Sequence, residues 1–135
     1  MKTRYKQLVR ESFVELQEVS GPLSLLFYGR LFGVEPGLRR MFSEDMAAQG
    51  KKLMEMLAAA VQGMDNWDAL KPALREMGDR HTGYGVQPAH YELVCDAMVW
   101  SISQALAGGA GPELKQAWRM LMDQVSQAMQ GIEPV

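Results

Sequence analysis

The sequence predicts an all-α protein, because apolar residues recur at helical spacing along most of the chain and proline and glycine interrupt them at intervals. No stretch alternates apolar and polar residues as a half-buried strand would, and no internal repeat is visible. Hydrophobic residues make up 47% of the 135 residues, which is typical of an ordinary packed domain. We therefore expect one all-α domain over residues 1–135, with about seven helices joined by short turns.

The first half of the chain is divided by proline. Apolar residues at helical spacing over residues 5–16 predict the first helix, and the Ser-Gly-Pro segment at residues 20–22 is a break, because proline fits the first turn of a new helix. Residues 23–32 are apolar almost all round, which is typical of a helix buried on most sides. Pro36 permits a further short helix, and residues 43–45 are expected to cap the helix that follows.

Four longer helices complete the prediction. Residues 49–64 present one apolar face, and residues 70–81 carry a second apolar face as far as a histidine. Residues 91–105 and 118–129 show the same periodicity. The breaks between these helices fall at residues 65–66, 83–86 and 108–112.

Composition excludes several classes of protein. The net charge is −2 and the Lys and Arg residues are scattered, so we expect no nucleic-acid partner. Cys95 is the one cysteine, which excludes a disulfide within the chain, a thiolate cluster and covalent C-x-x-C-H haem attachment. The charged N-terminus lacks the apolar stretch of a signal peptide, and no segment approaches the length of a membrane span. We expect a cytoplasmic protein.

The chain has two histidines, His81 and His90, and no ordinary metal-binding motif. Spacing alone favours a helix cap or a surface group over a ligand for either of them. A single histidine can hold a metal only where something else supplies most of the coordination sphere. Haem does so, leaving one axial position for an imidazole and one for a gas.

Three blocks of residues carry a resemblance to a known family. They read LFYGRLF at 26–32 with EP at 35–36 and LRRMF at 38–42, then QGKKL at 49–53, then MGDRH at 77–81 with YGV at 84–86 and HY at 90–91. In this order and spacing, the sequence resembles the globins over nearly its whole length, specifically single-domain bacterial globins and the haem domain of flavohaemoglobins. The resemblance implies a globin fold around one pocket that holds a non-covalent haem b, iron protoporphyrin IX.

The resemblance also implies a role for individual residues. His81 would be the iron ligand. Tyr28, Gln49 and Leu53 would line the distal side, where the gas binds. The implied haem contacts are Phe42, Lys52, Arg80, Val86 and Tyr91, with Lys52 and Arg80 placed near the haem carboxylates.

Plainer interpretations of these residues remain open from the pattern alone. Tyr28 would be a core tyrosine bonded to a carbonyl, and Gln49 a surface residue. Phe42 and Leu53 would be packing residues in any helical protein, and Lys52 and Arg80 would be solvated charges. Cys95 and the methionines are interpreted as packing. The resemblance implies that His90 is a partly exposed cap ahead of the helix that begins near Tyr91, and that Ser24 and Gly50 are small residues where two helices cross closely.

Two functions follow from the resemblance. The first is reversible, high-affinity binding of O2, and of CO and NO, through the Tyr28–Gln49 pair. The alternative is nitric oxide dioxygenation. Flavohaemoglobins carry a reductase after the globin and a proximal glutamate in the last helix; the sequence ends at Val135 without such a reductase, and residues 118–129 offer no match for the glutamate. Any catalytic cycle is therefore expected to need a separate reductase. A gas sensor would need an output domain, and a haem-free helical bundle is the remaining alternative.

Overall fold

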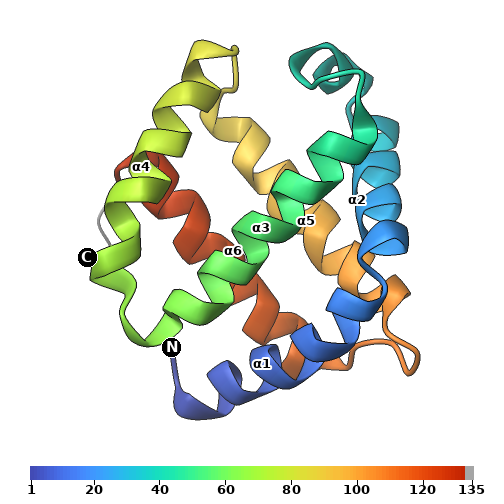
Figure 1. Cartoon of the computed structure of the whole chain (residues 1–135), viewed down its shortest axis with the longest axis vertical. Coiled ribbons are helices and arrows are strands. Elements are labelled where there is room, and N and C mark those ends of the chain that lie inside the picture. The colour runs from blue at the N-terminus through green and yellow to red at the C-terminus, as the bar shows by residue number, and fades with distance from the viewer. Residues whose placement is uncertain (133–135) are drawn as a thin grey trace.

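The computed structural model describes residues 1–132 and is helical almost throughout (Figure 1). The elements are α1 (Thr3–Glu18), α2 (Ser20–Val34), η1 (Pro36–Met41), α3 (Met46–Gln62), η2 (Gly63–Asp65), α4 (Trp67–Gly83), α5 (Pro88–Ala105) and α6 (Pro112–Gln130). No strand occurs within residues 1–132. The predicted all-α class is confirmed, and the short 3-10 turn η2 is the one element that the sequence pattern did not separate.

The helix boundaries follow the predicted break and capping signals closely. The first break lies at Val19, one residue before the expected segment, and Pro22 occupies the first turn of α2. Asp45 caps α3 as expected, because its carboxylate accepts the N–H of Ala48 at 3.1 Å. Gly85 adopts φ +97°, a conformation that glycine reaches without steric cost, in the turn after α4.

The helices pack in two groups that meet on α5 and α6. α2 packs against α5, while α4 and α1 pack against α6. Figure 1 shows α3 crossing in front of α5 and α6, with α2 and α4 on either side of it. Within the described residues, no helix is both long enough and apolar enough to cross a membrane.

Trp118 lies at the centre of the junction between α1 and α6. Its side chain is fully buried, and its indole N–H donates to the Ser12 hydroxyl at 2.9 Å. That hydroxyl donates in turn to the main-chain oxygen of Leu8 at 2.9 Å, so each buried polar group has a partner. The Phe13 ring lies 6.2 Å from the Trp118 ring.

Two glycines allow helices to approach closely. A Cβ on Gly50 of α3 would lie 2.8 Å from the Ser24 hydroxyl of α2, which confirms the predicted crossing of small residues. A Cβ on Gly78 of α4 would lie 1.8 Å from the main-chain oxygen of Met129 on α6. The second contact is between backbones, so α4 and α6 can keep this separation only with glycine at position 78.

Candidate functional site

A cavity of about 560 Å³ lies among α2, η1, α3, α4, α5 and α6. Its volume is within the range of cofactor and ligand sites, and its walls are mostly apolar. The cavity brings together residues from α2 through α6 and from η1. All nine residues singled out from the sequence line it: Tyr28, Phe42, Gln49, Leu53, Lys52, Arg80, His81, Val86 and Tyr91.

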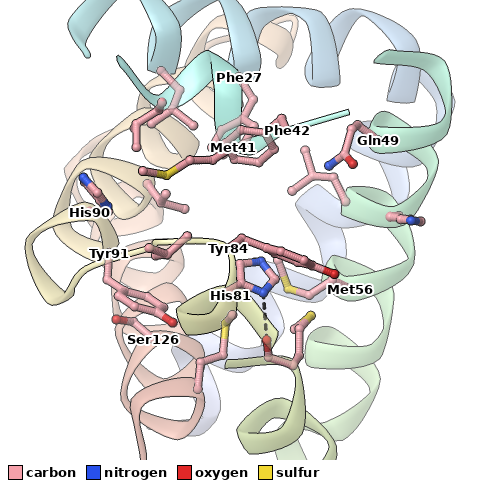
Figure 2. Close-up of a pocket in the computed structure, with 18 of the residues that line it drawn as sticks. Phe27, Met41, Phe42, Gln49, Met56, His81, Tyr84, His90, Tyr91 and Ser126 are labelled. Carbon is pink, nitrogen blue, oxygen red and sulfur yellow. Dashed lines mark hydrogen bonds between the residues drawn. The ribbon is translucent and has the colours of Figure 1, made fainter. Parts of the chain in front are cut away.

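His81 projects into the cavity from the last turn of α4 (Figure 2). Its Nδ1 lies 2.7 Å from the main-chain oxygen of Met77, the residue one turn earlier. A carbonyl only accepts, so Nδ1 carries the proton and Nε2 presents a free lone pair. The structure gives Nε2 no partner within residues 1–132.

The wall opposite His81, here called the distal side, is built from η1, α2 and α3. Figure 2 shows Phe42 and Gln49 facing His81 across the cavity. The Phe42 ring lies 5.5 Å from the Phe32 ring and 5.6 Å from the Tyr28 ring, so an aromatic cluster fixes its position. Leu53 adds an aliphatic side chain one turn after Gln49.

Tyr28 is buried in this wall, and its hydroxyl donates to the main-chain oxygen of Gln49 at 3.3 Å. Burial raises the pKa of the Tyr28 phenol, and the neighbouring Gln49 side chain offsets part of that rise. The phenol is therefore a neutral hydrogen-bond donor at physiological pH. Both interpretations of the sequence hold in part, because Tyr28 lines the cavity and is also bonded to a carbonyl.

The charged groups that line the cavity are cationic. Lys52 of α3 and Arg80 of α4 are both exposed at its edge, and no Asp or Glu is among the lining residues. Arg80 also pairs with Glu76 at 3.2 Å, outside the lining. An anionic group at this edge would therefore meet two cations and no carboxylate.

The proximal side, which carries His81, continues into the turn between α4 and α5. The Val86 N–H donates to the main-chain oxygen of His81 at 3.1 Å, which ties the backbone of this turn to the last turn of α4. Tyr91 is buried on the first turn of α5, and burial raises the pKa of its phenol. Ser126 of α6 also lines the cavity, and Figure 2 draws it on the same side as Tyr91.

The sequence pattern predicts the methionines as packing residues and does not indicate that some of them line the cavity. Five of them line it: Met41, Met56, Met77, Met122 and Met129. Their thioethers pack the core and also supply flexible, polarisable walls to the cavity. The signal was present in α6, where Met122, Val125 and Met129 share one helical face that also carries Ser126.

The geometry suits a ligand that is itself a metal complex and already supplies most of the ligands to the metal. Within residues 1–132, no three His, Cys, Asp or Glu side chains come together as a metal cluster. The cavity offers one imidazole nitrogen with a free lone pair, a pair of cations at its edge and apolar walls. A flat, largely apolar metal complex with peripheral anionic groups fits this donor set.

Comparison with known proteins gives consistent relatives. The flavohemoprotein of Bordetella parapertussis is 30% identical over 132 residues, and that of Bacillus subtilis is 25% identical over 130. These matches cover 95% and 94% of this chain but 33% of each relative, so the chain spans about a third of the length of these proteins.

Solved structures show the same fold. An engineered carbene transferase, a suggested nitric oxide dioxygenase from Rhodothermus marinus, superposes with a TM-score of 0.85 and 33% identity, covering 97% of this chain and 92% of that one. A bacterial globin from Campylobacter jejuni superposes with a TM-score of 0.84 at 20% identity, covering 98% and 96% of the two chains, which supports the fold alone.

The family model named Globin matches residues 25–129, the segment that contains every wall of the cavity. Together with the flavohemoprotein relatives, this match implies a haem in the cavity. The chain belongs to the globin family.

Proposed function

We propose that the chain holds one non-covalent haem b through His81 and binds O2 reversibly and tightly, with CO and NO as further ligands. The observation that carries the proposal is the hydrogen bond between His81 Nδ1 and the Met77 carbonyl, 2.7 Å long. It orients the imidazole so that Nε2, free of any described partner, is directed to the cavity.

The surroundings of the cavity support a haem rather than a neutral ligand. Lys52 and Arg80 stand where the two carboxylates of the haem could leave the cavity for solvent. Phe42, Leu53 and Val86 give apolar surfaces for the faces of a tetrapyrrole. Burying an uncompensated carboxylate in the same space would be costly, and the lining contains none.

Ferrous haem supplies one open coordination position for a diatomic gas. The part of this chain is to place two hydrogen-bond donors near that position, the Gln49 amide and the Tyr28 hydroxyl. A polarised ligand such as O2 gains more from such donors than CO does. Phe42 and Leu53 keep the site apolar, which strengthens any hydrogen bond formed there.

The Tyr28 hydroxyl can donate one hydrogen bond, and the main-chain oxygen of Gln49 accepts it at 3.3 Å. To donate to a gas ligand, the phenol must turn away from this carbonyl. The stabilisation of the ligand is then a difference between two hydrogen bonds, one to a charged acceptor at about 1.5–3 kcal/mol and one to a neutral acceptor at about 0.5–1.5 kcal/mol. Pairing the lower values and the upper values gives a difference of about 1–1.5 kcal/mol, which corresponds to roughly a five- to twelvefold change in affinity.

Reconstitution of the apoprotein tests the proposal directly. We expect His81→Ala to lose most of its haem affinity, measured by titration with haemin and the growth of the Soret band. His90→Ala, which removes the other histidine of the chain, should still take up one haem per chain. If His81→Ala took up haem as well as the parent and His90→Ala did not, the assignment of His81 as the iron ligand would be wrong.

A second candidate function is nitric oxide dioxygenation with electrons from a separate reductase. The flavohemoprotein relatives and the Rhodothermus structure favour it. Within residues 1–132, no Asp or Glu lines the cavity, which disfavours this function, since a carboxylate beside His81 would make its imidazole more electron-donating. Rapid and repeated conversion of NO to nitrate by the oxygenated protein, with an added flavin reductase, would establish the enzymatic function. A single turnover, after which the oxygenated protein does not re-form, would support gas binding instead.

A further inference from the structure

His90 lies at the edge of the same cavity and is held there by the start of α5 (Figure 2). Gln87 is the N-cap of this helix, and its main-chain N–H donates to His90 Nδ1 at 2.9 Å. The cap therefore confirms the sequence-based interpretation of His90. It also fixes the tautomer, because an accepting Nδ1 leaves the proton of the neutral imidazole on Nε2.

The Nε2–H of His90 is a donor without a described acceptor. The ring is half-buried, and the structure gives His90 no hydrogen bond through Nε2 within residues 1–132. Within residues 1–132, none of the residues that line the cavity is an Asp or a Glu, so the described part of the chain places no carboxylate in its walls. A ligand in the cavity that carries an anionic acceptor can receive this hydrogen bond.

We propose that His90 is a haem-binding residue that donates from Nε2 to one of the haem carboxylates, separately from the cations Lys52 and Arg80. This inference rests on the proposed haem site and gives His90 two roles. Its Nδ1 accepts the hydrogen bond that caps α5, and its Nε2–H would donate to the haem carboxylate. The loop between His81 and His90 carries Val86, whose N–H bonds to the His81 main chain, so eight residues of chain separate the proposed metal ligand from the proposed anchor.

Three substitutions separate the cap from the anchor. A Glu or Gln at this third helical position accepts the N-cap N–H in ordinary capping boxes. His90→Glu therefore keeps the cap but removes the donor and repels a carboxylate. His90→Gln keeps the cap and retains an N–H donor. His90→Leu removes both.

The test is the rate at which each reconstituted protein loses haem to an excess of a colourless apoglobin scavenger. We expect His90→Glu to release haem about three- to tenfold faster than the parent, because the hydrogen bond is charge-assisted but partly exposed to solvent. His90→Gln should stay within about twofold of the parent. Equal release rates for His90→Glu and the parent would overturn the inference.

The matched control is haem dimethyl ester, in which both carboxylates are blocked. With this cofactor the ratio between His90→Glu and the parent should fall to within about twofold, since neither repulsion nor a charged hydrogen bond remains. A ratio that persists with the ester would mean that the substitution acts through the helix start alone, and would contradict the assignment. Failure of the haem site itself is seen independently, as no Soret band and no CO spectrum in the parent.

Discussion

The proximal and distal sides of the cavity are held in place by different means. On the proximal side, the hydrogen bond from His81 to Met77 lies within one helix turn, and the Val86 N–H closes on the His81 carbonyl at 3.1 Å. On the distal side, the Tyr28 hydroxyl reaches across from α2 to α3 and makes one hydrogen bond of 3.3 Å. The first arrangement is set by local helix geometry, whereas the second depends on how two helices pack.

This difference predicts which side can adjust to a ligand. Helical hydrogen bonds of α4 fix the His81 backbone, and the close approach of Gly78 to α6 fixes the helix itself. The Tyr28 phenol has a single long bond and can exchange it for another. We expect the proximal side to respond to substitution through stability and haem retention, and the distal side through gas kinetics.

The largest expected effect is the protection of Cys95, which lies on α5 in the wall that α5 and α6 form, from alkylation. Burial raises the pKa of the Cys95 thiol to about 12, and its side chain is 2% exposed. Since the thiolate is the reactive form, alkylation by iodoacetamide at pH 8 should be roughly a thousandfold slower in the folded protein than in urea. Mass spectrometry over time measures both rates. Native alkylation at the unfolded rate would show that this wall opens freely.

The next largest effect is expected at the contact between α4 and α6. Gly78→Ala places a Cβ against the Met129 main-chain oxygen, and the two helices must separate to accept it. We expect a loss of about 3 kcal/mol in the free energy of unfolding, measured by urea denaturation. Gly83→Ala, on the same helix with nothing within 4 Å of its Cβ, is the control and should change stability little. Equal stability of both variants would contradict the described crossing.

Tyr28→Phe tests the adjustable distal donor. It removes only the hydroxyl, so packing of the aromatic cluster is kept, and O2 dissociation should become about tenfold faster while CO dissociation changes far less. The control is Tyr91→Phe on the proximal side, which should leave O2 dissociation within about twofold of the parent. Stopped-flow measurement gives both rates. An unchanged O2 rate in Tyr28→Phe would mean that the phenol stays with the Gln49 carbonyl when gas is bound.

Gln49→Leu is expected to have the smallest effect of the four. The amide is half-buried and can be replaced as a donor by the Tyr28 hydroxyl, so O2 dissociation should accelerate only about two- to fivefold. Because both donors serve one ligand, the double variant should change the rate by less than the product of the single changes. Additive effects would show that the two side chains act at separate places.

Much of the fold was predictable because its signals are local. Proline in the first turn of α2 and α5 and Asp45 as the cap of α3 are features of short segments, and the helix boundaries followed them. The close approach of Gly78 to Met129 was not predicted, because the partners are 51 positions apart and a glycine within a helix has several possible causes.

The site divides in the same way. The gathering of Tyr28, Gln49 and His81 around one cavity was expected from a family resemblance, and helical periodicity alone gave no such prediction. The bond from Tyr28 to the Gln49 carbonyl depends on the separation of α2 and α3, which no sequence pattern records. For the same reason, the methionines could be recognised as core residues but not as cavity walls.

The most direct test of the account is the absorption spectrum of the purified, reduced protein under nitrogen and then under CO. The account predicts a five-coordinate, high-spin ferrous haem, because Gln49 offers an amide, a poor ligand for ferrous iron, and Tyr28 a phenol that burial keeps protonated. Addition of CO should then shift the Soret band at one haem per chain. A six-coordinate, low-spin spectrum before CO is added, or no Soret band at all, would contradict the central claim that His81 alone ligates the iron and leaves the distal position open.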